Sequence, residues 1–441
     1  MTRRPRSPTS ITGCEGVNRA TEWPDSGLDI SALHARGWRP EPFREFILKV
    51  HGRCNLACDY CYVYESADQS WRSRPRAVGD AVVRRAADRI AEHAARHGLG
   101  AVEVVLHGGE PLLAGAATIE LVATAVRAAV PAGCRVDLSL QTNGVLLDEP
   151  TLDLLDAHGV GVAVSLDGDA TAHDRHRRFP NGKGSHPAVT KGLELLAGRY
   201  RHLYRGLLCA VDTANDPVAT YEALLATSPP QIDFLLPHGT WDAPPPGLRP
   251  DGGPTRYAEW MIAAFDRWYG ADPQETGVRL FEEILNLTLG GASATENIGL
   301  SPVVMLVVET DGTLQQVDTL KTSYPGAPET GLTVFANSFD EALAHPGVVA
   351  RQIGLAALCG ECRDCPVRDV CGGGAYAHRY RAGSGYLNRS VYCADLRALI
   401  GHIGGRVRAD LAGLTGSQGD GLDQALKEPV VLGRILGDVD G

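Results

Sequence analysis

Three cysteines in one short loop are the residues of this sequence best suited to chemistry. Cys54, Cys58 and Cys61 follow the apolar run Phe46–Val50, and three and then two residues separate them. Thiolates are soft ligands that suit iron–sulfur clusters or zinc. Both kinds of centre take four ligands in closed structural sites, so three thiolates in one loop leave a coordination position open. An open position on a metal is where chemistry can take place.

This loop resembles the cluster loop of the radical S-adenosylmethionine (SAM) enzymes, and the aromatic Tyr60 before the third cysteine is part of the resemblance. The resemblance implies that the three thiolates hold a 4Fe–4S cluster and that SAM binds the remaining iron. It also implies that the reduced cluster cleaves SAM to a 5′-deoxyadenosyl radical. For the loop taken alone, a zinc knuckle with a distant fourth ligand is the alternative.

Strands alternate with helices between residues 45 and 240, which predicts right-handed βαβ units around a parallel sheet. The expected strands cover residues 46–50, 102–106, 135–140, 160–166, 203–211 and 231–236. Six such units predict an α/β fold with an open, TIM-like partial (β/α)6 barrel, which is also what the radical SAM resemblance implies. The C-terminal ends of the strands should then carry the site.

Polar motifs follow the second, third and fourth expected strands. Gly108, Gly109 and Glu110 resemble the family segment that binds the SAM amino group, since a carboxylate accepts hydrogen bonds from ammonium and glycines permit close backbone approach. The resemblance implies further SAM contacts from polar or aromatic residues, with turn roles or solvated loop charge as the alternative. These residues are Tyr60, Asn143, Ser165, Asp167 and Arg177. A guanidinium such as that of Arg177 could bind a SAM or peptide carboxylate.

A second group of cysteines lies within 35 residues near the C-terminus, among Gly, Asp and Arg residues. It consists of Cys359, Cys362, Cys365, Cys371 and Cys393. The group resembles the SPASM extension, a cysteine-rich C-terminal domain that carries auxiliary 4Fe–4S clusters. The resemblance implies one auxiliary 4Fe–4S cluster, because Val317 and Ala375 stand where a second cluster would need cysteines. Cys359 is an unassigned extra thiol, and zinc is the alternative metal for this group.

The organisation expected for the 441 residues has five parts. These are a partly disordered N-terminal extension (1–40), the radical SAM partial barrel (41–240), a linker and helical bridge (241–300), a SPASM-type iron–sulfur domain with a C-terminal helix (301–413) and a flexible tail (414–441). No apolar run reaches the roughly 18 residues of a membrane helix, and no export signal follows the basic N-terminus. Clustered cysteines then favour metal in a reducing, cytoplasmic compartment. The net charge of −11 argues against a nucleic-acid partner.

Segments around the second cysteine group resemble the Fxs-type maturases, which form cyclophanes in ribosomally made precursor peptides. The segments cover residues 308–312, 316–321, 365–374 and 390–395. The resemblance implies that a hydrogen leaves the β-carbon of a precursor residue and that this carbon joins a nearby aromatic ring, typically across a Phe-x-Ser-like motif. It also implies an electron donor such as ferredoxin or flavodoxin. Asp318 is the candidate catalytic group for taking up the proton, with solvated hairpin charge as the alternative.

Other reactions remain open as alternatives on the same frame. Thioether formation is one, and formylglycine-type oxidation of a serine or cysteine in a sulfatase is another. This chain has fewer auxiliary cysteines than the sulfatase-maturating enzymes, which have the fuller pattern. The smaller number argues against that reaction. A non-catalytic metal-binding peptide scaffold is the alternative outside enzymes, but a scaffold needs neither an open metal position nor SAM-binding motifs.

Overall fold

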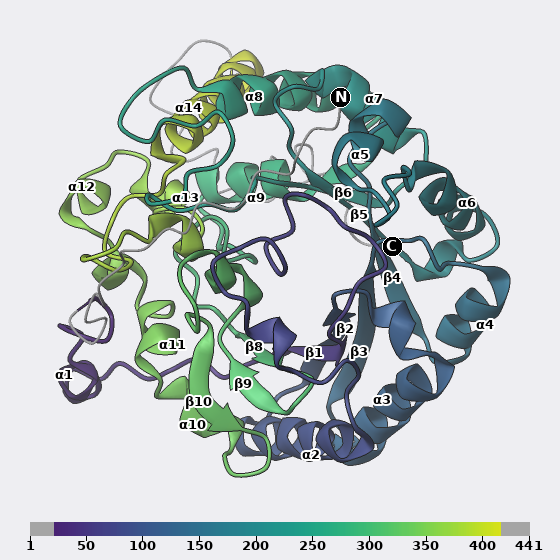
Figure 1. The fold of residues 1–441 in the computed structure, drawn as a ribbon. Helices are drawn as coiled ribbons and strands as arrows, with labels where there is room; N and C mark the ends of the chain where they lie inside the picture. The colour runs from purple at the N-terminus through teal and green to yellow at the C-terminus, as the bar shows by residue number, and fades with distance from the viewer. Residues whose placement is uncertain (1–21, 416–441) are drawn as a thin grey trace, which may run out of the picture.

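A ten-stranded sheet organises residues 22–415, the part of the chain that the structure, a computed structural model, describes (Figure 1). The strand order is β10-β9-β8-β1-β2-β3-β4-β5-β6-β7, and the neighbours from β1 to β7 pair in parallel. Their bounds are β1 Glu45–His51, β2 Ala101–Gly108, β3 Arg135–Thr142, β4 Val160–Ser165, β5 Tyr204–Ala210, β6 Gln231–Leu235 and β7 Gly277–Val278. The predicted α/β partial barrel is therefore confirmed.

Helices form an outer ring around the first six strands (Figure 1). They are α2 Asp80–His97, α3 Ala116–Ala129, α4 Glu149–Ala157, α5 Ala170–His176, α6 His186–Ala197 and α7 Pro217–Leu225. In α2, Val83, Ala87, Ile90 and Ala94 recur at helical spacing and are buried against the sheet. The helix ends at Gly98, whose φ of +60° is a left-handed conformation that glycine adopts readily.

Strand β1 sends alternate residues to opposite faces of the sheet. Phe46 and Leu48 are buried in the core between the sheet and the helices. Glu45 and Ile47 line the interior of the barrel. Lys49 continues this second series, so the alternation directs its charged side chain into the barrel, where it is 3% exposed.

A C-terminal hairpin extends the sheet beyond β1. Strand β8 (Met305–Val308) pairs in parallel with β1, whereas β9 (Thr313–Gln315) and β10 (Glu329–Thr333) continue it antiparallel. The hairpin that these strands form is thus part of the barrel sheet itself. The short 3-10 helix η5 (Asp318–Thr322) follows β9 and carries Asp318 to the end of the barrel strands.

The remaining helices lie before and after the hairpin in sequence. They are α1 Ile30–Ala35, α8 Arg256–Tyr269, α9 Arg279–Thr288, α10 Phe339–Leu343, α11 Pro346–Ala350, α12 Gly360–Arg363, α13 Arg368–Cys371 and α14 Cys393–Thr415. Helix α14 lies beside α8 (Figure 1), and the Tyr269 hydroxyl donates a 2.7 Å hydrogen bond to Asp410 across the pair. The C-terminal helix expected from the sequence is therefore anchored on the helical bridge.

The Pro/Gly-rich stretch at 237–254 contains no helix or strand and crosses one side of the barrel mouth. The backbone N–H of Trp241 donates to the Tyr380 carbonyl at 3.0 Å, and its indole N–H donates to the Arg389 carbonyl at 2.8 Å. The start expected to be disordered falls partly in residues 1–21, and the expected flexible tail falls mainly in 416–441; both ranges lie outside the described residues. Among the helices of the described part, none is long and apolar enough to cross a membrane.

Candidate active site

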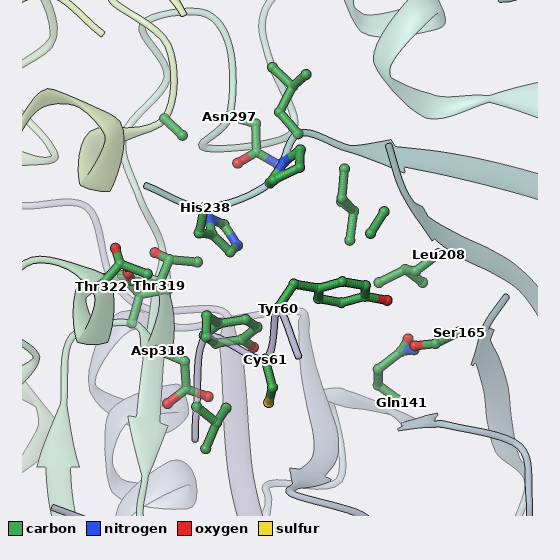
Figure 2. A pocket seen from close by; sticks show the side chains of 18 of the residues that line it. Tyr60, Cys61, Gln141, Ser165, Leu208, His238, Asn297, Asp318, Thr319 and Thr322 are labelled. Carbon is green, nitrogen blue, oxygen red and sulfur yellow. The ribbon is translucent and has the colours of Figure 1, made fainter. Parts of the chain in front are cut away.

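A cavity of about 1500 Å³ lies inside the barrel and reaches from the C-terminal ends of its strands to the start of β1. The cysteine loop after β1, the ends of β2 to β6, the stretch at 237–246 and helix η5 line it. Figure 2 shows Cys61, Tyr60, His238 and Asp318 around this space. The cavity therefore brings together residues from both cysteine-bearing halves of the chain.

The three cysteines of the loop line the cavity together. Burial raises the pKa of the Cys54 thiol to about 11 and that of Cys58 to about 12, and it also raises the pKa of Cys61. The Cys54 sulfur faces two N–H donors, the backbone of Leu56 at 3.4 Å and the side chain of Asn143 at 3.5 Å. Such donors stabilise a metal-bound thiolate and tune an iron–sulfur cluster.

Gly108 and Gly109 let the end of β2 lie directly against the cysteine loop. A Cβ on Gly108 would come within 2.1 Å of the His51 carbonyl oxygen. A Cβ on Gly109 would come within 1.9 Å of the Tyr64 hydroxyl and 2.6 Å of the Arg53 backbone. Both glycines line the cavity, so the close approach expected of them serves the cysteine loop itself as well as any ligand beside it.

Glu110 is fully buried beneath the cavity and does not line it. Its carboxylate accepts hydrogen bonds from the Leu112 N–H at 3.0 Å, the Thr142 hydroxyl at 2.8 Å and the Asn143 N–H at 2.9 Å. Burial raises its pKa to about 7, although these donors oppose the shift. Glu110 thus ties the end of β3 to β2, and its expected contact with SAM stays a prediction.

Asn143 and Ser165 do line the cavity, at the ends of β3 and β4. The Asn143 amide donates to Asn55 at 2.8 Å as well as to the Cys54 sulfur, and Gln141 donates to the Ser165 hydroxyl at 3.1 Å. These bonds hold polar side chains beside the cysteine loop. The arrangement suits a polar cofactor such as SAM.

Tyr60, Arg177 and the buried Asp167 form one connected group next to the loop. The Tyr60 hydroxyl donates to Asp167, and Arg177 Nε donates to the same carboxylate at 2.7 Å. The Arg177 guanidinium also lies 5.4 Å from the centre of the Tyr60 ring. Burial alone would raise the pKa of Asp167, but Arg177 lowers it below the ordinary value. The three residues expected to bind the cofactor are thus held in one place, with Tyr60 and Arg177 facing the cavity.

Asp318 lines the cavity near Cys61 (Figure 2) and forms ion pairs with two buried lysines. It contacts Lys49 from β1, and Lys321 lies 3.3 Å away. Burial would raise the pKa of this carboxyl, but the two ammonium groups lower it well below its ordinary value. Lys321 also pairs with Glu309 at 2.8 Å. The candidate base is therefore a carboxylate held ionised in the cavity wall, and the alternative of solvated hairpin charge is wrong because Asp318 is 6% exposed.

Several cavity residues were missed in the sequence. His238 Nδ1 lies 3.3 Å from His378 Nε2, and the Tyr62 ring meets His238 edge-on at 5.0 Å. Burial lowers the pKa of His238 to about 4, and burial also lowers that of His378, so both rings are neutral. No sequence pattern connects these residues. Lys49 did carry a signal, since a charged residue in an apolar strand needs a partner.

The C-terminal cysteines lie in or next to α12, α13 and the start of α14, and α13 lies beside α9 (Figure 1). Electrostatic interactions link Cys393 to Cys365 and Cys359, and Cys371 to Cys393 and Cys365. The Cys362 thiol, hydrogen-bonded to Cys359, lowers the pKa of Cys359 to about 6. The cavity lining contains Val317 and Ala375 but none of these five cysteines.

Arg379 supports the C-terminal cysteine group from within. Its guanidinium donates to the carbonyls of Gly372, Gly373 and Gly374 at 2.6, 3.1 and 2.8 Å, which holds the loop after Cys371. Its positive charge also lowers the pKa of Cys371 and Cys362, against the larger effects that raise them. A buried cation beside several thiols suits an anionic metal–thiolate cluster.

The spacing of the sulfurs distinguishes a cluster from a single zinc ion. Zn–S bonds of about 2.3 Å place tetrahedral thiolates roughly 3.8 Å apart. Within residues 22–415, no three cysteine sulfurs lie within 4.8 Å of one another. Both cysteine groups therefore fit a larger iron–sulfur cluster better than one zinc ion, with Cys54, Cys58 and Cys61 as ligands of one cluster and ligands of the other drawn from the C-terminal five.

Comparison with known proteins defines the class. Residues 48–224 match the model of the Radical SAM superfamily, a range that includes the cysteine loop and the polar ends of β2 to β4. The chain therefore contains a radical SAM domain, and the expected enzyme class is confirmed. The 4Fe–4S cluster and SAM are the cofactors of that superfamily, in agreement with the residues that line the cavity.

The chain is also similar to particular radical SAM enzymes. The chain is 26% identical over 387 residues to the serine-type anaerobic sulfatase-maturating enzyme of Klebsiella aerogenes, covering 83% of this chain and 89% of that one. It is 25% identical over 286 residues to the cysteine-type enzyme of Clostridium perfringens strain 13, covering 63% and 74%. The expected relation to radical SAM maturases is thus supported, and these relatives are of the sulfatase-maturating kind.

Solved structures show the same fold. Native anSMEcpe with bound AdoMet superimposes with a TM-score of 0.70 at 22% identity, covering 84% of this chain and 99% of that one. Streptococcus suis SuiB bound to the precursor peptide SuiA gives 0.54 at 12% identity, covering 82% and 78%. The first match covers far more of this chain than the barrel alone, so its C-terminal part shares in the fold of that structure.

Proposed function

We propose that this chain is a radical SAM maturase that crosslinks a ribosomally made precursor peptide, joining an aromatic ring to the β-carbon of a nearby residue. The observation that carries the proposal is the ionised Asp318, held between Lys49 and Lys321 in the wall of a large cavity that also contains the cysteine loop. The precursor peptide is the substrate, and a ferredoxin or flavodoxin is the proposed electron donor.

The size and lining of the cavity support a peptide substrate. Sites for one small molecule usually measure about 300–1,000 Å³, whereas this cavity measures about 1500 Å³. SAM beside the cysteine loop would leave space toward Val317, Ala375 and His378 on the opposite side. Tyr62 and His238 meet edge-on there, and such rings pack well against a further aromatic ring.

When bound, the reduced cluster and SAM supply a radical that removes one hydrogen atom from the peptide β-carbon. The cavity residues orient the peptide so that this carbon bonds to a carbon of the neighbouring ring, and they exclude water. The ring adduct must then lose one electron and one proton to become aromatic again. The C-terminal cysteines would hold an auxiliary cluster that could accept the electron in its oxidised state, and we assign the proton to Asp318.

The base strength of Asp318 suits the final proton loss of the crosslinking reaction. A carboxylate whose pKa lies well below its ordinary value is a weak base. Recovery of aromaticity makes the proton of an oxidised ring adduct strongly acidic, so a weak base suffices. The hydroxyl of a serine whose β-carbon has lost a hydrogen atom and an electron is also strongly acidic, so Asp318 could take up the proton in either reaction.

Formylglycine-type oxidation of a serine or cysteine is the second candidate. It is favoured by the similarity to the sulfatase-maturating enzymes, which extends over most of this chain. It shares the removal of a β-hydrogen and the loss of one electron and one proton. The two candidates therefore differ in the product and not in the first step.

The deciding experiment incubates reconstituted enzyme, SAM and reductant with two peptides. One carries a Phe-x-Ser motif, and the other carries the same serine with Leu in place of Phe. We expect the first peptide alone to lose two hydrogens, with fragmentation blocked between the linked residues and no reaction with a carbonyl reagent. Equal conversion of the Leu peptide, with a product that reacts with the carbonyl reagent, would instead establish formylglycine-type oxidation.

A further inference from the structure

A third group of side chains of metal-ligating types lies outside the cavity, where α2 meets α10 on the outer face of the barrel (Figure 1). His93 and His97 lie one turn apart on α2 and share one face of that helix. Asp340 of α10 faces both: its Oδ1 lies 3.0 Å from His93 Nδ1 and 2.6 Å from His97 Nε2. All three candidate ligand atoms lie within 4.8 Å of one another.

The burial of His93 is not explained by an ordinary hydrogen-bonded contact. Its side chain is 1% exposed, and the rings of Phe43, Phe46 and Phe339 surround it. Neither of its ring nitrogens has a well-aligned hydrogen-bond partner, although Nδ1 lies 3.0 Å from Oδ1 of the Asp340 carboxylate. Buried polar atoms almost always have a partner, so an imidazole in this state calls for one.

Asp340 and the Phe43 backbone lie close to His93, but Asp340 is shared with other groups. Asp340 Oδ1 already accepts the hydrogen bond from His97, and Asp340 Oδ2 lies 3.4 Å from Arg96 Nε on the solvent side. Arg96 is 69% exposed, so it can turn away into water. A cation between the two rings and the carboxylate would take one lone pair from each of the three residues.

We propose that His93, His97 and Asp340 bind one divalent transition-metal ion of the zinc type. Two imidazoles and one carboxylate are a ligand set that zinc commonly takes, with water in the fourth position. Asp340 is 18% exposed and His97 is 27% exposed, which leaves a side open to water. The ion would join α2 of the barrel to α10 of the C-terminal part and stabilise their contact, while its fourth position would stay open to water.

The test must separate this site from the cysteines, which also bind zinc. We would therefore use enzyme with its iron–sulfur clusters reconstituted, treat it with a chelating resin, and dialyse it against zinc chloride. Metal analysis compares the wild type with His97→Ala and Asp340→Asn. His202→Ala is the matched control, because His202 also pairs with an aspartate, Asp156, on the protein surface.

We expect one zinc per chain in the wild type and the control, and at least tenfold weaker zinc binding in both site variants. Zinc should raise the melting temperature of the wild type and the control only. SAM cleavage should be the same in all four proteins. Crystals grown with zinc should show an anomalous peak between α2 and α10. Equal zinc content in Asp340→Asn and the wild type, or a crystal without that peak, would overturn the proposal. If His97→Ala does not fold, the Asp340→Asn protein and the crystal decide.

Discussion

At the scale of single residues, the pairing of Asp318 with Lys49 sets the chemistry that the cavity can perform. Lys49 is buried in the first strand, and Asp318 arrives from a segment about 270 residues later. Their contact keeps a negative charge inside the protein at neutral pH, because two ammonium groups offset the cost of burying the carboxylate. The same contact limits how strongly that carboxylate attracts a proton.

Asp318→Asn should leave SAM cleavage intact and lower formation of the peptide product by roughly 10²–10⁴-fold, which is the usual contribution of a general base. Asn has nearly the same shape but cannot accept the proton. Rates of 5′-deoxyadenosine and of crosslinked peptide, measured in the same reaction, separate the two effects. Wild-type product from this variant would exclude Asp318 as the base.

Lys49→Met should raise the pKa of Asp318 toward its ordinary value, because Lys49 is the larger of the two charges that lower it. The carboxylate works only when ionised, so the variant should lose product formation at a higher pH than the wild type as the solution is made more acidic. Product rate against pH measures this. An unchanged profile would mean that Asp318 does not titrate during turnover.

Sequence patterns predicted some residues of the candidate active site and missed others. Cysteines at short, regular spacing are recognisable as metal ligands, and Asp167 and Arg177 could be predicted because they follow an expected strand. Lys49 and His378 come together with their partners only through the tertiary fold, so local spacing contains no trace of those contacts. Asp318 was a weak candidate because its sequence neighbours, unlike its neighbours in space, do not show that it is buried.

At the scale of elements, β1 begins with a carboxylate whose ionised form is unfavourable in the folded protein. Glu45 pairs in register with Glu103 of β2, and burial together with that second carboxylate raises the pKa of Glu45 to about 7. The folded protein therefore retains a proton that the unfolded chain releases near its ordinary pKa of 4.5. The free energy of unfolding should accordingly fall as the pH rises from about 4.5 to about 7.

In Glu45→Gln this titration is absent, so its free energy of unfolding should fall less between pH 5 and pH 7 than that of the wild type. The two declines should differ by on the order of 1 kcal/mol. Denaturant unfolding at both pH values measures the difference. Glu120→Gln, on the exposed side of α3, is the control and should keep the wild-type slope. Parallel slopes for Glu45→Gln and the wild type would contradict the assignment to Glu45.

The elements themselves were largely predictable. Alternating apolar strands and periodic helices located β1 to β6 within a few residues, because burial on both faces of a parallel sheet imposes such patterns. The pairing of β8 with β1 was not predictable, since a hairpin shows which strands are adjacent in sequence and nothing of which edge they join. That pairing is what delivers Asp318 to the barrel.

At the scale of the whole molecule, two cysteine groups imply two separate iron–sulfur clusters. After anaerobic reconstitution we expect about eight irons and eight sulfides per chain, falling to about four of each in the Cys54/Cys58/Cys61 triple alanine variant. Iron and acid-labile sulfide analysis, with zinc measured beside them, makes the comparison. About twelve irons in the wild type would mean that the C-terminal five cysteines support more than one cluster, contrary to the single auxiliary cluster proposed.

The order of the strands also has a consequence for how the protein is made. One edge of β1 is covered by β8, whose residues follow some 260 positions later. At a synthesis rate of about 5–20 residues per second, that edge stays open on the ribosome for roughly 13–50 s. An open edge can pair with other strands. The nascent barrel therefore depends on protection from aggregation until its C-terminal third has been translated.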